Sequence, residues 1–185
     1  PEDLFVTCVK ELVKIEKDWI LPSPGALYIR PSMIPLDKGV SYRASETYRF
    51  FIILSPSKSY FSKETGISVY IERNLSRAAI GGVGEAKCGG NYASALLPMR
   101  EAKLKGAEQV LWLDSKDHKY VEEAGAMNVM FVYQNKIITP ALNGSILHGI
   151  TRASVLEIAK DLGYEVEEKK VEIAKILTDA KSGKL

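Results

Sequence analysis

Hydrophobic and polar residues alternate along the chain with two different periods, which predict a succession of helices and strands. Apolar residues spaced three and four apart predict a helix over residues 1–20. An alternation of period two, or a short apolar run between turn residues, predicts strands. These strands cover residues 26–34, 48–54, 67–72, 109–114, 128–133, 136–139 and 164–171. The run at 48–54 is largely apolar, so we expect a strand that is buried on both faces.

Two further helices are predicted in the second half of the chain. The first follows Gly89-Gly90-Asn91, with Asn91 as its N-cap, and stops at Gly106. Its predicted apolar face consists of Tyr92, Ala95, Leu96, Met99 and Ala102. The second helix follows Gly149 and stops at Gly163. Its predicted apolar face consists of Val155, Leu156, Ala159 and Leu162. We expect the C-terminal end to be helical or frayed.

A segment rich in Ser, Pro, Lys and Gly follows the strand at 48–54. This composition is typical of a boundary between domains. We therefore expect an interdomain linker at residues 57–66, with one domain part at residues 1–56 and another at residues 67–185.

Composition excludes several classes of protein. The 185 residues carry a net charge of +2 with acids and bases interspersed, so neither nucleic acid nor an anionic membrane is an expected partner. The apolar runs are far too short to span a bilayer. The two cysteines, Cys8 and Cys88, form no disulfide framework, and reduced thiols in a cytoplasmic protein are the expectation. With only His118 and His148, no metal site is expected.

Lys87 stands in the glycine-rich loop that precedes the central helix. Glycines near it let backbone or a flat ligand approach its amine. A lysine enclosed in such a pocket can lose its proton and act as a nucleophile, which is what a Schiff base requires. A lysine beside glycines can equally be a solvated surface residue, and this stretch alone leaves both interpretations open.

Two other side chains have chemistry that fits an aromatic cofactor. Tyr92 lies five residues after Lys87, so its phenol can share a pocket with the amine, or it is a core aromatic. Glu123 lies at a loop after a strand, where its carboxylate can pair with a ring nitrogen. Alternatively it is a surface acid, as we expect for Glu122.

Thr151 begins the second helix, next to Gly149 and Ile150. Free N–H groups and a hydroxyl at a helix N-terminus form a phosphate site, although Thr151 can also be an ordinary N-cap. An amine, a phenol, a carboxylate and a phosphate site together meet the requirements of pyridoxal phosphate.

Several segments together resemble the successive motifs of the branched-chain amino acid aminotransferases. They read EAKCGGNYASALLPMREAKLKGAEQVLWLD, YVEEAGAMNVMF and LHGITRASVLEIAKDLGYEV, and ALYIRP is similar to the family's small-domain strand. The resemblance runs over nearly the whole chain. It implies an α/β (α+β) fold of the type IV pyridoxal-phosphate class, in a homodimer or larger homo-oligomer. Residues 1–56 would end a small α/β domain, and residues 67–185 would begin a larger, barrel-like cofactor-binding domain.

The resemblance also implies roles for individual residues. Lys87 would be the Schiff-base lysine and would move a proton between the substrate Cα and the cofactor C4′. Glu123 would pair with the pyridine nitrogen, Tyr92 would bond O3′, and Ile150 and Thr151 would bind the phosphate. The substrate would be contacted by Tyr28, Arg30, Gly125, Ala126 and Met127.

The reaction implied is transfer of the amino group of Leu, Ile or Val to 2-oxoglutarate, which gives glutamate and a branched 2-oxo acid. Two alternatives stay open. One is a D-amino acid aminotransferase or an aminodeoxychorismate lyase of the same fold. The other is a non-catalytic module that keeps the fold.

Three departures from the family pattern bear on these expectations. Ala126 stands where many members carry a hydroxyl, so backbone N–H groups would have to bind the substrate carboxylate. His148 replaces a usual proline, either as a loop variant or with a role of its own. The family's phosphate-binding arginine and C-terminal Gly-Thr-Ala loop have no counterpart here. We therefore expect an internal fragment that is a poor enzyme by itself.

Overall fold

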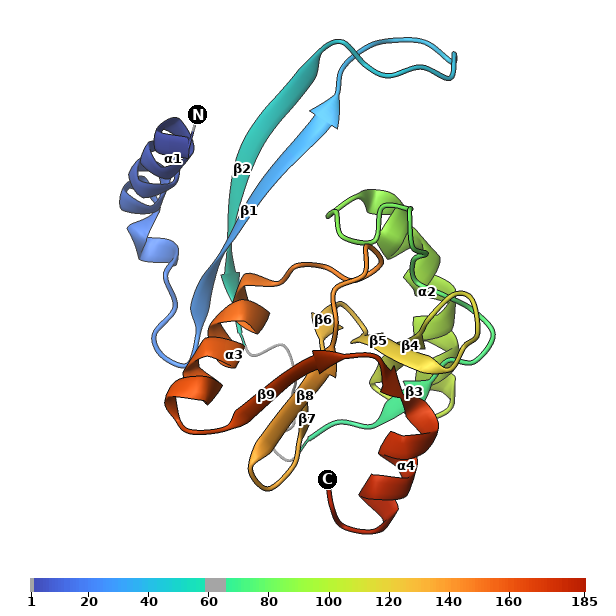
Figure 1. Cartoon of the computed structure of the whole chain (residues 1–185). Helices are drawn as coiled ribbons and strands as arrows, with labels where there is room; N and C mark the ends of the chain where they lie inside the picture. Colours follow the sequence, from blue (N-terminus) through green and yellow to red (C-terminus); the bar gives the residue numbers. More distant parts are fainter. Residues whose placement is uncertain (1, 59–65) are drawn as a thin grey trace. The chain divides into compact units, whose positions relative to one another are not determined.

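The computed structural model describes residues 2–58 and 66–185, and the chain divides into two compact units, residues 1–64 and 65–185 (Figure 1). Each unit has its own helices and strands. Most of the linker expected at 57–66 lies outside the described residues.

The first unit consists of a helix and a β-hairpin. Helix α1 (Glu2–Ile15) confirms most of the helix expected over residues 1–20, but it ends earlier than expected and is followed by a short 3-10 turn, η1 (Lys17–Trp19). Strands β1 (Ala26–Pro35) and β2 (Tyr48–Ser57) pair along their full length as an antiparallel hairpin. Helix α1 packs on β2, where the rings of Phe5 and Phe50 lie edge to face with centroids 6.1 Å apart.

The expectation that residues 48–54 are buried on both faces is wrong. Phe50 is 52% exposed and Ile53 is 50% exposed, and none of the described residues of the first unit is buried. The physical reason is that the sheet has only two strands, with one helix beside it. Apolar side chains gathered on such a hairpin are typical of a surface that another element or molecule covers.

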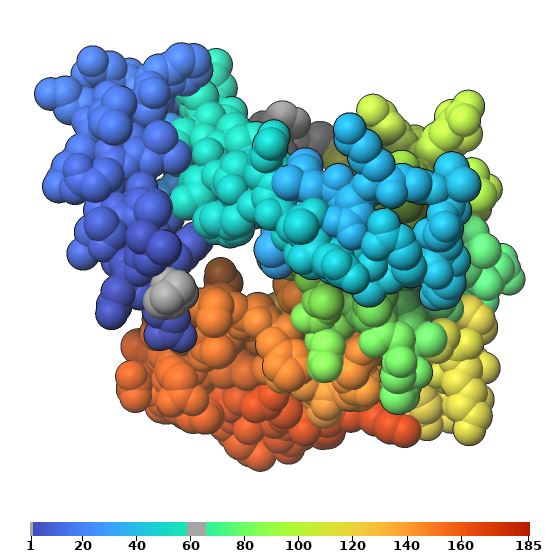
Figure 2. Space-filling view, turned by 90° about the horizontal axis from the view of Figure 1, so that it is seen from above, coloured from blue at the N-terminus to red at the C-terminus, as the bar shows by residue number. Residues whose placement is uncertain are grey.

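Asp37 organises the loop that joins the two strands of the hairpin. Its carboxylate accepts hydrogen bonds from the backbone N–H groups of Glu46 (3.0 Å) and Thr47 (3.1 Å) and from the Arg43 guanidinium (2.9 Å). The bonds from the Glu46 backbone, the Thr47 hydroxyl and Arg43 hold the pKa of Asp37 well below its usual range. In Figure 2 this loop (light blue) extends away from α1 (dark blue).

The second unit is built on two sheets of mixed direction. One sheet has the order β10-β5-β4-β3, with β6 also paired to β5, and the other has the order β7-β8-β9. The pairs β3–β4 and β8–β9 are parallel, and the remaining pairs are antiparallel. The strands are β3 (Val69–Ile71), β4 (Gln109–Leu113), β5 (Tyr120–Ala124), β6 (Met127–Asn128), β7 (Phe131–Val132), β8 (Lys136–Pro140), β9 (Glu165–Lys169) and β10 (Val171–Glu172).

Strand β4 is buried along its whole length, as its apolar run predicts. Leu111 and Leu113 belong to the cluster in which residues of both sheets pack together. Val110 and Trp112 point the other way and pack with Ala102 of helix α2 (Gly89–Leu104). Because side chains alternate between the two faces of a strand, β4 contributes apolar residues to two separate cores.

Helix α2 confirms the predicted helix, but its expected apolar face is right only in part and its expected N-cap is wrong. Ala102 is buried and Ala95 and Met99 pack against its cluster, whereas Tyr92 and Leu96 are 46% and 70% exposed. Cys88 occupies the N-cap position, and Asn91 lies inside the first turn. Its side-chain amide donates to the carbonyls of Val83 (2.6 Å) and Ala86 (2.9 Å), so it fixes the glycine-rich loop rather than capping the helix.

Helices α3 (Ile150–Asp161) and α4 (Ile173–Lys181) complete the unit. On α3 the apolar face is narrower than expected, because Leu156 and Ala159 are buried whereas Val155 and Leu162 are exposed. Helix α4 gives the C-terminal segment a defined structure. Its buried residues Ile173 and Ile176 join the cluster between the sheets.

Candidate active site

A cavity of about 600 Å³ opens in the second unit between the glycine-rich loop, β6 and the start of α3. It is lined by residues of three segments that are distant in the sequence. They are Lys87, Ala126, Met127, Asn128, Met130, Leu147, His148, Gly149, Ile150, Thr151 and Arg152.

The amine of Lys87 lies against the phenol of Tyr92. Lys87 Nζ donates to Tyr92 Oη at 3.4 Å, across the junction between the loop and the first turn of α2. Tyr92 is 46% exposed, so the alternative that it is a core aromatic is wrong. The loop and the helix turn thus bring together an amine and a phenol that are five residues apart.

Glu123 lies near the end of β5 and is buried, so the alternative that it is a surface acid is wrong. Its Oε1 accepts hydrogen bonds from the backbone N–H of Leu147 (3.0 Å) and from the amide of Asn128 (3.1 Å). Its Oε2 forms an ion pair with Arg77 Nε at 2.7 Å. Burial raises the pKa of the Glu123 carboxyl, and the Arg77 guanidinium opposes that shift.

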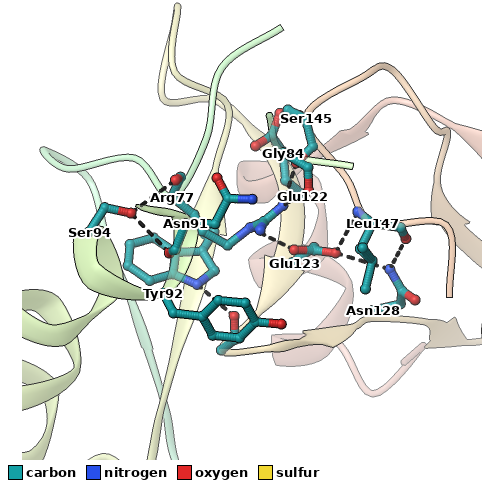
Figure 3. A network of polar contacts seen from close by, with 12 residues as sticks. Arg77, Gly84, Asn91, Tyr92, Ser94, Glu122, Glu123, Asn128, Ser145 and Leu147 are labelled. Atoms are coloured by element: carbon teal, nitrogen blue, oxygen red, sulfur yellow. Dashed lines mark hydrogen bonds and ion pairs between the residues drawn. The ribbon is translucent and has the colours of Figure 1, made fainter. Parts of the chain in front are cut away.

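Arg77 was not identified from the sequence, and it connects the parts of this network (Figure 3). Besides Glu123, its guanidinium binds the carbonyl oxygens of Gly84 (3.1 Å) and Ser145. Its side chain is only 10% exposed. No period or motif marks an isolated arginine in a loop. The only available signal was that a buried carboxylate requires a cationic partner.

Glu122 is buried too, which contradicts the expectation of a surface acid. It is 3% exposed and accepts hydrogen bonds from the Ser145 hydroxyl and from the Asn143 amide (3.4 Å). The two adjacent carboxylates therefore have different partners, and only Glu123 is bound to Arg77 (Figure 3).

The start of α3 forms one wall of the cavity. Gly149 is the N-cap, so the alternative that Thr151 is an ordinary N-cap is wrong. As residues of the first turn, Ile150 and Thr151 carry N–H groups that no helix carbonyl accepts. These groups and the positive end of the helix dipole favour an anion at this wall.

Gly125 makes the tight turn between β5 and β6. Its φ of +59° lies in the left-handed region, and a Cβ at this position would overlap the side-chain oxygen of Gln109. Its carbonyl accepts the indole N–H of Trp112 at 2.9 Å. The turn places Ala126 and Met127 in the cavity wall.

Tyr28 and Arg30 lie on β1 in the first unit, on the same face of the strand, with the guanidinium carbon 4.8 Å from the ring centroid. All residues that line the cavity belong to the second unit.

The lining of the cavity fits pyridoxal phosphate, because the amine of Lys87 suits an aldehyde and the helix N-terminus suits a phosphate. A buried carboxylate suits a protonated ring nitrogen. Among the described residues, however, Glu123 and Tyr92 do not line the cavity, and Glu123 is connected to it through Asn128, which donates to its Oε1 at 3.1 Å. Among residues 2–58 and 66–185, no cluster of three or more His, Cys, Asp or Glu side chains is arranged to hold a metal ion. In the same described residues, no helix has the length and apolar character needed to cross a membrane.

Comparison with known protein families identifies the family of the chain. The model of the family described as amino-transferase class IV matches residues 2–181. The chain belongs to this family. A probable branched-chain-amino-acid aminotransferase from Staphylococcus epidermidis is 46% identical over 187 residues, which cover all of this chain and 52% of that protein.

Solved structures of branched-chain amino acid aminotransferases share the fold. The Escherichia coli enzyme matches with a TM-score of 0.71 and 31% identity, over 81% of this chain and 50% of that one. The enzyme of Thermobaculum terrenum, solved in its PLP-form, matches with a TM-score of 0.70 and 26% identity, over 80% and 48%. The expected fold class is confirmed, and the chain spans about half the length of the proteins it matches.

Proposed function

We propose that the protein is a pyridoxal-phosphate-dependent aminotransferase that transfers the amino group of Leu, Ile or Val to 2-oxoglutarate. The observation that carries this proposal is the cavity that is lined both by Lys87 and by the N-terminal residues of α3. The names of the Staphylococcus epidermidis and Escherichia coli proteins support the substrate class. The PLP-form of the Thermobaculum terrenum enzyme supports the cofactor.

Each candidate site residue of the second unit would have a separate role. Bound pyridoxal phosphate supplies a carbonyl for the substrate amine and an electron sink for the bonds at Cα. Lys87 holds the cofactor covalently and moves the proton between the substrate Cα and the cofactor C4′. Tyr92 bonds O3′, Glu123 keeps the ring nitrogen protonated, and the N–H groups of Ile150 and Thr151 bind the phosphate.

Two groups of residues would bind the substrate. Tyr28 and Arg30, of this chain or of a partner copy, would contact the substrate or its carboxylate, and residues 125–127 would lie beside the carboxylate. Because Ala126 has no hydroxyl, the N–H groups of this turn provide the hydrogen bonds.

The proposal extends to the organisation of the complete protein. Residues 1–56 belong to a small domain and residues 67–185 to a large cofactor-binding domain, joined at 57–66. The exposed apolar side chains of β1 and β2 support a homodimer or larger homo-oligomer. The unpaired thiols Cys8 and Cys88 are in keeping with a cytoplasmic location.

Covalent attachment of the cofactor to Lys87 is the direct test. Borohydride reduction of the yellow holoprotein, followed by peptide mass mapping, should find a pyridoxyl group on Lys87. Label on Lys103 or Lys105 would contradict the assignment. Lys87→Ala should remove essentially all turnover, since general acid–base catalysis contributes roughly 10²–10⁴-fold and the covalent anchor is lost as well.

The alternatives are separated by the amino donor. A panel of L- and D-amino acids with 2-oxoglutarate should give turnover with Leu, Ile and Val. Turnover of D-alanine, or release of an aromatic amine from aminodeoxychorismate, would point to the other activities of this fold. A complete protein that never binds the cofactor would indicate a non-catalytic module.

A further inference from the structure

His148 and Glu85 face each other at the rim of the cavity. His148 Nε2 lies 3.2 Å from Glu85 Oε2, and the two side chains are 59% and 52% exposed. His148 immediately precedes the N-cap of α3, and Glu85 lies two residues before Lys87. The pair therefore joins the loop that carries the lysine to the segment that leads into the phosphate-binding helix.

The same two segments are also joined at their buried end. Arg77 binds the carbonyl oxygens of Gly84 and Ser145 with one nitrogen, Nη2. The backbones approach so closely there that a Cβ on Gly84 would overlap the Ser145 carbonyl. The loop is thus held at two points, one buried and one at the surface.

We propose that the His148–Glu85 pair is the exposed half of a two-point clamp, which holds the Lys87 loop against the start of α3 and makes His148 a positioning residue for cofactor binding. This inference rests on the proposed function for its cofactor. His148 acts through Glu85 and the loop, and it makes no direct contact with the phosphate. The proline expected here from the family resemblance could not form this contact with Glu85.

The clamp should depend on pH because its strength depends on the imidazole charge. The loop that faces His148 carries two charged groups, Glu85 and Lys87. On α3, Arg152 forms an ion pair with Glu168 (2.6 Å) and donates a hydrogen bond to the Pro140 carbonyl (3.0 Å). A protonated imidazole forms an ion pair with a carboxylate, whereas a neutral imidazole offers it at most a hydrogen bond. The contribution of the clamp should therefore be greater on the acid side than on the alkaline side.

A double-mutant cycle tests the clamp in the protein expressed from its complete reading frame. The variants are Glu85→Gln, His148→Gln and the double variant, with pyridoxal phosphate affinity measured by absorbance titration. At about pH 6, each single variant should raise the dissociation constant roughly two- to fivefold, and the double variant should raise it no further. At about pH 8.5 each single variant should raise the dissociation constant by a smaller factor than at about pH 6.

A matched control and a cofactor-free readout separate the possible failures. Glu157→Gln removes the partner of Lys160 in another exposed pair on α3, so its dissociation constant should not change. Without cofactor, amide exchange in residues 81–88 should be faster in Glu85→Gln and His148→Gln than in the control. Additive effects, which a direct phosphate contact by His148 would produce, or unchanged loop exchange would overturn the clamp. Faster loop exchange in a protein that never binds pyridoxal phosphate would support the clamp and refute the proposed function.

Discussion

At the scale of single residues, the two adjacent carboxylates of β5 show how position decides chemistry. Glu123 and Glu122 are both buried, but Glu123 is held by Arg77, Asn128 and the Leu147 N–H, whereas Glu122 is held by Ser145 and Asn143. We expect Glu123→Gln to lower turnover by about 10²- to 10³-fold, the size of the loss when one electrostatic contact to developing charge is removed. Steady-state kinetics at saturating cofactor measure this. A larger loss in Glu122→Gln would reverse the assignment.

Arg77 should matter for stability as well as for the site. Arg77→Met leaves the Glu123 carboxyl buried without its cation, and breaking a buried ion pair costs roughly 3–5 kcal/mol of unfolding free energy. Without Arg77, the pKa of Glu123 should rise further. A carboxyl whose folded pKa is raised loses its contribution to stability as pH rises through that value, so the deficit should be larger at about pH 8 than at about pH 5. Urea unfolding at both values measures it, with the exposed Arg100→Met as control. A deficit independent of pH would contradict the coupling to Glu123.

At the scale of elements, α3 shows why a helix start can serve as an anion site while its first residues look ordinary. The N-cap is a glycine, and Thr151 in the first turn keeps its hydroxyl available. Thr151→Val should weaken cofactor affinity more than it slows the saturated enzyme, because the proposed role of the hydroxyl is to hold the phosphate rather than the reacting atoms. Titration and steady-state kinetics separate the two quantities. Thr178→Val on α4, where the hydroxyl bonds the Ala174 carbonyl at 2.9 Å, is the matched control. An unchanged dissociation constant would rule out this role for Thr151.

At the scale of the whole molecule, the two units differ in how well they bury apolar surface. The second unit has clusters around β4 and between its sheets, while none of the described residues of the first unit is buried. In the 185-residue chain, amides of β1 and β2 should therefore exchange with solvent much faster than those of β4. Hydrogen exchange with mass spectrometry measures this, and in the proposed homo-oligomer of the complete protein the hairpin should become protected. Equal protection of both units in the isolated chain would show that the first unit is stable by itself.

The sequence was sufficient to predict structure wherever the deciding interactions join residues that are close together in the chain. The helices and most strands follow from periods of 3.6 and two, because backbone hydrogen bonds and the direction of the side chains repeat with those periods. The buried strand β4 was predicted because its five residues are nearly all apolar. Lys87 and Tyr92 could be paired because they lie five residues apart in one loop and helix turn.

The tertiary structure alone decided what depends on distant partners. Arg77 reaches Glu123 and Ser145 across long stretches of chain, and no period in the sequence records such contacts. Burial of Glu122 and exposure of β2 depend on which layers surround each strand, and that is a property of the assembled sheets. The partner of His148 became visible only when folding brought two loops together at the rim of the cavity. A residue's type limits the chemistry it can perform, but the neighbours that permit this chemistry are determined by packing between segments distant in the sequence.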